Sequence, residues 1–313
     1  MSLAFVFPGQ GAQTIGMGRD LADAYPAAKA VFDEVDEALG EKLSELIWEG
    51  DQDKLTLTEN AQPALMATSM AAVKALEAEG VDISAADYVA GHSLGEYSAL
   101  CSVGSLSIAD AARLLRIRGR AMQSAVPVGE GAMAAILGLD FEAVAKLAQD
   151  ATAGEVCQVA NENDPMQSVV SGNRAAVERA VVLAKSRGAK RALMLPVSAP
   201  FHCSLMTPAA AEMAEALSHV DINEPKVPLV ANVLAAAVTN PALIRSLLVD
   251  QVSGRVRWKT SVEWMTDHGV TEFWEVGAGK ALSGMIRRIA KEASTRTVGT
   301  ASEVADAAAS LSS

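Results

Sequence analysis

The chain has 313 residues, 50% of them hydrophobic and 20% charged, which is enough for one large domain or a main body with an insert. A formal charge of −12 argues against general binding to nucleic acid or to anionic lipid, because both need a basic surface. Three cysteines without metal or CxxC spacing favour a reducing compartment, and no run reaches the ~18 apolar residues of a membrane helix. We therefore expect a cytoplasmic protein.

The first part of the chain alternates between strand and helix patterns. Leu3–Phe7 is a short apolar run that ends at Pro8 and Gly9, as a buried strand does when it enters a loop. The elements predicted after it are helices at 25–40 and 63–80, a strand at 87–90, a sharp turn at 91–95 and a helix toward residue 103. Strand, turn and helix in this order predict a parallel α/β sheet.

The pattern changes between residues 128 and 197. The elements predicted there are a strand at 131–138, a helix at 140–150, strands at 156–160 and 168–171, a helix at 173–188 and a strand at 190–197. Asp140 and Asn173 are candidate N-caps of the two helices. The order βαββαβ is that of the ferredoxin-like unit. We expect an α/β body formed by residues 1–127 and 198–313, with a ferredoxin-like insert at 128–197.

After the insert the α/β pattern resumes. The elements predicted there are helices at 206–219, 261–268 and 282–292 and strands at 227–233 and 272–276. The tail, residues 301–313, is rich in Ala and Ser and is expected to fray. No internal repeat is evident.

The sharpest chemical signal is Gly91-His92-Ser93-Leu94-Gly95, which matches the nucleophile elbow G-x-S-x-G. The strained serine needs a glycine on each side, because a larger side chain would collide with the strand or the helix. The helix N-terminus then offers the Leu94 N–H to a developing oxyanion. A chance loop of small residues is the alternative, but the position between a strand and a helix favours a nucleophile.

A nucleophilic serine needs a base, and the chain has four histidines. His92 adjoins Ser93 and is expected to serve as a scaffold hydrogen-bonder. His219 and His268 fall at helix C-termini, where the helix dipole favours them. His202 lies on a loop just before a helix and is the candidate base, because loops carry catalytic groups more often than helix ends do.

Arg118 is the most informative charged residue. On a helix over 110–123, Arg113, Arg116 and Arg120 form a face that we expect to be solvated, whereas Arg118 lies about 140° from Arg113 on the apolar face. A buried guanidinium needs a partner, and its fork fits a carboxylate. An internal ion pair or a stem that reaches outward would also explain it. Beside a nucleophilic serine, a substrate carboxylate is the better interpretation.

Two glycine loops and one basic cluster invite other interpretations. The loop after the first strand has Thr14 where a dinucleotide fingerprint needs its third glycine, so we expect Gln10 instead to supply a second oxyanion N–H. The 277–280 loop lacks two residues of the phosphate-loop pattern and is interpreted as a tight strand-to-helix turn. Basic residues between 185 and 191 form either a solvated face or a docking patch for an acidic partner.

Five motifs carry a resemblance to a known family. They are FPGQGAQ at the start, GHSLGEYSAL around Ser93, RIRGRAMQ around Arg118, PVSAPFHCSLM around His202 and EVGAGKAL near the end. The same motifs occur in the same order in malonyl-CoA:acyl carrier protein transacylases, which the chain resembles to about residue 290. The resemblance implies an α/β-hydrolase-like body with a parallel sheet and an inserted ferredoxin-like small subdomain.

The resemblance also implies a role for each matching residue. Ser93 would carry the malonyl ester, His202 would be its base, and the N–H groups of Gln10 and Leu94 would form the oxyanion hole. Arg118 would bind the malonyl carboxylate, the Gln251 backbone carbonyl would orient His202, and Asn161 would face the cleft. At position 201 this chain has Phe, where some bacterial relatives have a small polar residue. In related polyketide acyltransferases a Phe-His pair accompanies malonyl preference, because the ring would crowd an α-methyl group.

The implied function is ping-pong transfer of malonyl from malonyl-CoA to the phosphopantetheine thiol of acyl carrier protein, for fatty-acid synthesis. It needs no metal or redox cofactor, no nucleic acid and no membrane, and nothing requires more than a monomer. A serine hydrolase or thioesterase, a non-catalytic carrier-binding subunit and, more distantly, a dinucleotide enzyme are the alternatives. Fatty-acid and polyketide pathways remain open, as does the carrier's docking surface.

Overall fold

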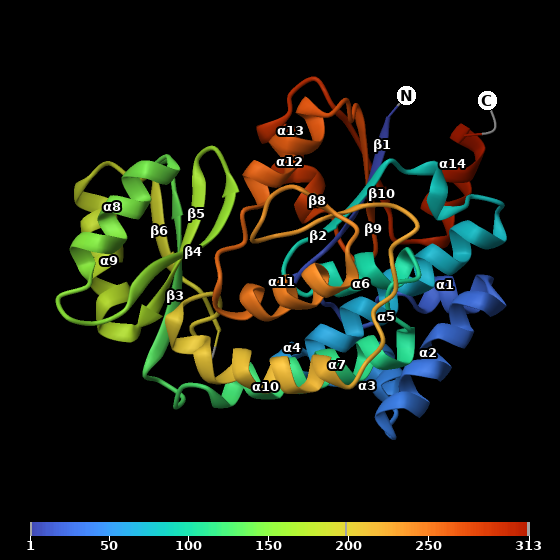
Figure 1. Ribbon diagram of the computed structural model, residues 1–313, viewed down its shortest axis with the longest axis horizontal. Coiled ribbons are helices and arrows are strands. Elements are labelled where there is room, and N and C mark those ends of the chain that lie inside the picture. The colour runs from blue at the N-terminus through green and yellow to red at the C-terminus, as the bar shows by residue number, and fades with distance from the viewer. Residues whose placement is uncertain (1, 198, 312–313) are drawn as a thin grey trace.

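Two β-sheets organise the computed structural model, which describes residues 2–197 and 199–311. The larger sheet has six strands in the order β10-β9-β1-β2-β7-β8, and the smaller has four in the order β4-β5-β3-β6. Figure 1 shows the smaller sheet, with helices α8 and α9, as a lobe at one side of a larger helix-rich body. This mixed α/β fold with a separate antiparallel sheet confirms the predicted fold class.

The larger sheet is parallel except at one edge. Its strands are β1 (Leu3–Phe7), β2 (Tyr88–Gly91), β7 (Leu229–Val230), β8 (Ala237–Val238), β9 (Glu272–Val276) and β10 (Ser294–Val298). Only β8 is antiparallel to its neighbour, β7. Every residue of β1 is buried, as expected of a central parallel strand covered on both faces. The strand predicted at 227–233 is shorter in the structure, where only the two residues of β7 are paired.

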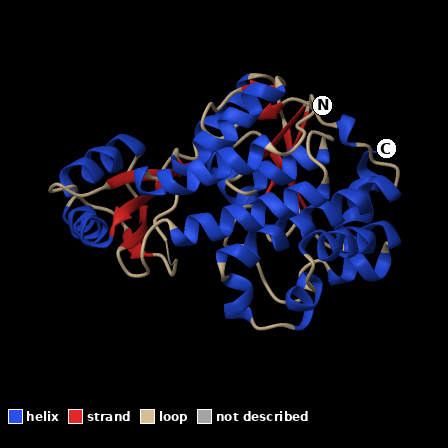
Figure 2. Cartoon of the chain, turned by 60° about the horizontal axis from the view of Figure 1, so that its bottom comes forward, coloured by secondary structure: helices blue, strands red, loops and turns tan. Residues whose placement is uncertain are grey.

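Helices surround this sheet, as Figure 2 shows in blue. They are α1 (Arg19–Ala24), α2 (Pro26–Leu39), α3 (Leu43–Glu49), α4 (Gln52–Thr56), α5 (Thr58–Ala78), α6 (Gly95–Ser102), α7 (Ile108–Ser124), α10 (Thr207–Ser218), α11 (Pro241–Ser253), α12 (Trp258–Asp267), α13 (Ala281–Ile289) and α14 (Ala301–Leu311). Helix α5 is buried along almost its whole length and packs against α2, α6 and α7. None of the helices in the described part of the chain is long and apolar enough to cross a bilayer.

The small lobe has the predicted βαββαβ order. Its elements are β3 (Gly131–Leu137), α8 (Phe141–Ala151), β4 (Cys157–Asp164), β5 (Gln167–Asn173), α9 (Arg174–Ser186) and β6 (Arg191–Met194). Asp140 caps α8 as predicted, because its carboxylate accepts the Ala143 N–H at 2.8 Å. Asn173 is the N-cap residue of α9, as predicted, but its side chain makes no cap bond and instead accepts the Val156 N–H at 2.8 Å.

The C-terminal tail is a helix where fraying was expected. Ala301–Leu311 forms α14, which packs on α5 and buries Val304, Ala307 and Ala308. Glu303 accepts the N–H groups of Gly299 and Thr300, which stabilises the start of the helix. The alanines that suggested a weak tail provide both high helix propensity and a flat face for packing.

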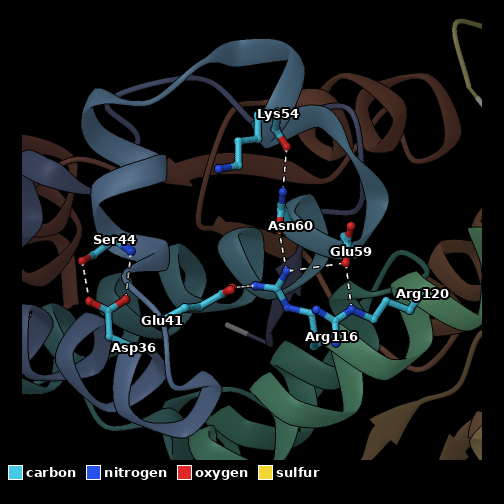
Figure 3. Close-up of polar contacts among 8 residues, drawn as sticks. All are labelled: Asp36, Glu41, Ser44, Lys54, Glu59, Asn60, Arg116 and Arg120. Carbon is cyan, nitrogen blue, oxygen red and sulfur yellow. Dashed lines mark hydrogen bonds and ion pairs between the residues drawn. The ribbon is translucent and has the colours of Figure 1, made fainter.

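The face of α7 that we expected to be solvated is partly covered. Arg116 is buried and donates to Glu41 and, at 2.5 Å, to Asn60 Oδ1 (Figure 3). Glu59 lies 4.0 Å from Arg116 and also accepts from the exposed Arg120. Glu41, just after α2, and the first turn of α5 therefore cover this part of α7, which the spacing of arginines within one helix could not reveal.

Candidate active site

The turn after β2 has the backbone strain of a nucleophile elbow. Ser93 has φ +54°, a left-handed conformation that is uncommon for a residue with a side chain. A Cβ on Gly91 would overlap the Gly95 backbone, and a Cβ on Gly95 would overlap the Phe7 carbonyl. The two glycines are therefore needed for the turn, as predicted. The Asn232 side chain accepts the Ser93 N–H at 2.8 Å and holds the strained residue.

His202 is the histidine that meets Ser93. Its Nε2 lies 2.8 Å from Ser93 Oγ, and its Nδ1 lies 2.9 Å from the Gln251 carbonyl oxygen. Because a carbonyl only accepts, Nδ1 carries the hydrogen and Nε2 is free to accept the serine proton. Burial, helped by the nearby Arg118, lowers the pKa of His202 to about 3. The ring is therefore neutral at physiological pH, as a general base requires.

Arg118 points its guanidinium at the same serine. Its side chain is 1% exposed. Nη1 donates to Gln62 Oε1 at 2.7 Å, and Nη2 donates to Gln251 Oε1 at 2.8 Å and to Ser93 Oγ at 3.2 Å. Among the described residues, no carboxylate lies within 4.0 Å of this guanidinium, and Nε has no partner. No direct ion pair within the described residues and no outward-reaching stem therefore accounts for Arg118.

A cavity of about 410 Å³ joins these groups between the two lobes. Its walls come from β3, β4 and β5 of the small lobe and from α13 and the loop after β1 of the body. The predicted site residues that line it are Gln10, Ser93, Arg118, Asn161, Phe201 and His202. Leu94 does not line it; it is buried at the N-cap of α6, and the N–H groups of Gly95 and Glu96 that follow it donate to the carbonyls of His92 and Ser93. Within the described residues, no cluster of His, Cys, Asp and Glu side chains could hold a metal ion.

Gln251 does more than the sequence suggested. Its side chain is fully buried on α11. Besides accepting from Arg118, it donates through Nε2 to the Ser93 carbonyl at 2.9 Å and to Glu96 Oε2 at 2.7 Å. One residue therefore contacts the base, the nucleophile and the arginine. From the sequence, a role was expected only for its backbone carbonyl.

Sequence reasoning missed three polar residues around this centre. They are Gln62 on α5, Glu96 on α6 and Asn232 after β7, and all three are buried. A helical wheel of α5 would have shown Gln62 on an apolar face, by the argument used for Arg118. Asn232 carries no comparable local signal, because its partners are distant in sequence.

The remaining histidines behave as expected. His92 Nε2 lies 2.9 Å from Asn163 Oδ1 on β4, so it links the elbow to the small lobe. His219 and His268 are the C-cap residues of α10 and α12. Neither lines the cavity, which leaves His202 as the histidine that contacts Ser93.

Comparisons with known proteins agree with this geometry. The family model described as acyl transferase domain matches residues 4–308. The chain is 49% identical over 297 residues to the malonyl CoA-acyl carrier protein transacylase of Bacillus subtilis, covering 95% of this chain and 93% of that protein. The acyl-carrier-protein-S-malonyltransferase from Bartonella henselae superposes with a TM-score of 0.98 at 53% identity, over 100% of both chains.

A further solved structure contains a carrier. It is described as a type II PKS acyl-carrier protein in complex with its malonyl-transacylase, and it matches with a TM-score of 0.96 at 40% identity, over 99% of this chain and 100% of that one. The family model and these similarities extend over both lobes and include every residue of the site. The chain therefore belongs to the acyl transferase domain family, within its malonyl CoA-acyl carrier protein transacylases.

Proposed function

We propose that this chain transfers the malonyl group of malonyl-CoA to the phosphopantetheine thiol of acyl carrier protein, through a malonyl ester on Ser93, and so supplies extender units for fatty-acid synthesis. One observation carries the proposal. A serine 2.8 Å from a neutral histidine shares its cavity with a buried guanidinium that no carboxylate of residues 2–197 and 199–311 contacts directly. The serine and histidine suit acyl transfer, and the guanidinium suits an acyl group that ends in a carboxylate.

In the first half-reaction, His202 Nε2 accepts the Ser93 proton as Oγ attacks the thioester carbonyl. The N–H groups of Gln10 and Leu94 bind the oxyanion, and losing one such donor typically costs ~10²–10³ in rate. In the empty site Arg118 Nη2 donates to Ser93 Oγ at 3.2 Å, which places the guanidinium beside the position of the bound acyl group. His202 then returns the proton to the departing sulfur, which leaves as CoA. The carrier thiol enters next, and the steps run in reverse.

Substrate choice depends on the walls of the cavity. Arg118 binds the malonyl carboxylate with two of its nitrogens once the acyl group is present. Phe201 lines the cavity and is 8% exposed, so it leaves little room for a methyl group on the α-carbon. Asn161, on β4, faces the same space from the small lobe and contacts the acyl or pantetheine chain.

The arrangement favours a transferase over the two main alternatives. A serine hydrolase commonly has a carboxylate behind its histidine, but here the Gln251 carbonyl oxygen occupies that position at 2.9 Å. A non-catalytic binding subunit has no need of a neutral base held on a strained serine. Transfer also requires that water be kept from the ester, and we propose that the 128–197 subdomain covers the cleft formed by the 1–127 and 198–313 subdomain.

The partners follow from the same chemistry. We propose malonyl-CoA and acyl carrier protein as the two substrates, a monomer as the working form and the cytoplasm as the compartment, which three free, buried cysteines favour. The basic residues at 185–191 are one docking candidate for the acidic carrier. Arg187 of this cluster is already paired with Asp150 at 2.7 Å, so Lys185, Lys190 and Arg191 would carry the contact.

The test is intact-mass analysis after mixing the protein with malonyl-CoA and then with the holo carrier. A malonyl adduct should appear on the Ser93 peptide, disappear when the carrier is added, and be absent from Ser93→Ala. A folded protein without the adduct would support the binding subunit. Free malonate released as fast as malonyl-carrier forms would support the hydrolase.

A further inference from the structure

A buried carboxylate lies directly behind the elbow, outside the catalytic pair. Glu96, in the first turn of α6, is 1% exposed. Its Oε2 accepts from Gln251 Nε2 at 2.7 Å and from the Asn232 N–H at 3.2 Å. Both hydrogen bonds that Glu96 accepts from the described residues end on Oε2, and no cation among them lies within 4.0 Å. Oε1 is therefore left to carry a proton.

The Gln251 amide connects this carboxylate to Arg118. Gln251 accepts from Arg118 through Oε1 and donates to Glu96 through Nε2, so it lies between a buried positive group and a buried carboxylate. The other groups that face Glu96 carry no charge at neutral pH. Tyr97 on the same helix has its pKa raised to about 12, and His202 is neutral. Strands β1 and β2, which pack on α6, have no charged side chain, and α5 adds no charge that acts on Glu96.

Resting on the function proposed above, we propose that Glu96 is the internal counter-charge of Arg118 and takes up one proton from solvent when Ser93 is malonylated. In the empty site, Arg118 stabilises the Glu96 carboxylate through Gln251. The malonyl carboxylate then binds Arg118 directly and compensates its positive charge, so this charge no longer stabilises the ionised form of Glu96. Two buried anions facing one cation are costly, and protonation of the more distant one removes that cost.

The protons of the acyl transfer itself balance without Glu96. The Ser93 hydroxyl proton leaves on the CoA sulfur, the Ser93 ester forms and the thioester breaks. The Glu96 proton is an additional one, drawn from the buffer. It returns to the buffer when the malonyl group leaves on the carrier thiol and Arg118 again faces Glu96 alone. A neutral acyl group brings no carboxylate, so it moves no proton of this kind.

The environment of Glu96 makes such a change accessible near neutral pH. Burial raises the pKa of Glu96 to about 7, and the hydrogen bonds from Gln251 and Asn232 and, to a smaller degree, the Arg118 charge oppose that rise. Neutralising Arg118 with a substrate carboxylate removes the last of these opposing effects, so the pKa rises further. Glu96 is then ionised in the empty site above about pH 7 and protonated in the malonyl-enzyme.

The experiment counts protons per adduct. The protein is mixed with excess malonyl-CoA in weak buffer at about pH 7.5 with an indicator dye, and intact mass gives the amount of malonyl-enzyme. About 0.7 proton should be taken up per adduct, because a group with a pKa of about 7 is mostly ionised there. Ionisation of the released CoA thiol offsets only about a tenth of a proton. Glu96→Gln should load malonyl with no uptake.

A matched control replaces another buried acid. Asp36→Asn changes a carboxylate that is 4% exposed and bonded to Ser44 (Figure 3), and that does not line the cavity. This variant should keep the full uptake. If Glu96→Gln does not fold, the wild type alone decides, because at about pH 6 Glu96 is already protonated and uptake should nearly vanish.

The outcomes separate this inference from the proposed function. A malonyl adduct without proton uptake, equal uptake in wild type and Glu96→Gln, or undiminished uptake at about pH 6 would each overturn the role of Glu96 and leave the transferase intact. A folded wild type that forms no adduct would overturn the transferase itself. A Glu96 with a purely structural role would lower loading without changing the proton count.

Discussion

Replacing Arg118 tests the basis of substrate choice. In Arg118→Ala, the malonyl carboxylate loses the two guanidinium nitrogens that now bind Gln62 and Gln251. A hydrogen bond to a charged group is worth about 1.5–3 kcal/mol, so two of them amount to about 3–6 kcal/mol. At about 1.4 kcal/mol per decade, kcat/KM for malonyl loading should fall by about 10²–10⁴.

The assay compares acyl donors within the same variant. Loading of Ser93 from malonyl-CoA and from acetyl-CoA is followed by intact mass over time. Acetyl has no carboxylate, so its loading should be retained or should increase. Arg113→Ala, on the exposed face of the same helix, is the matched control and should leave both rates unchanged. Equal losses for malonyl and acetyl would refute the carboxylate role, because they would indicate damage to the elbow and not to recognition.

Three further predictions concern the elbow, the base and the cavity wall. Gly95→Ala should lower the melting temperature and abolish loading, because the added Cβ would overlap the Phe7 carbonyl. In Gly284→Ala the added Cβ would only contact the Arg288 side chain at 3.7 Å, so this change should be neutral or slightly stabilising, and equal behaviour of the two variants in thermal melts would contradict the argument. His202 has a folded pKa of about 3 and an unfolded one near 6.5, so below about pH 6.5 the unfolded chain binds a proton that the folded one does not. Below about pH 6.5, this histidine should lower the free energy of unfolding by about 1.4 kcal/mol for each unit that the pH falls, down to about pH 3. Urea titrations of His202→Ala at several pH values should lack this part of the pH dependence. Phe201→Ala should raise loading of methylmalonyl relative to malonyl by about tenfold, and an unchanged ratio in competition assays would remove the steric argument.

Much of the local structure was predictable because its causes are local. The G-x-S-x-G turn depends on two glycines within five residues, and the cap of α8 depends on Asp140 and the N–H three residues later. The βαββαβ order of the small lobe follows from apolar periodicity and turn residues. The helical wheel of α7 likewise placed Arg118 on a buried face from its neighbours alone.

What a polar side chain meets once it is buried was decided by the tertiary structure. The Asn173 side chain bonds Val156 and not its own helix, and Arg116 is covered by Glu41 after α2 and by Asn60 on α5. Residues 301–311 become a helix because α5 gives them a surface to pack against. The Gln251 side chain reaches the Ser93 carbonyl across 158 residues of sequence. Such partners are determined by how separate elements pack, and no periodicity within one element records them. The sequence therefore determined which groups could do the chemistry, and the packing of α6, α7 and α11 decided which of them are hydrogen-bonded to one another.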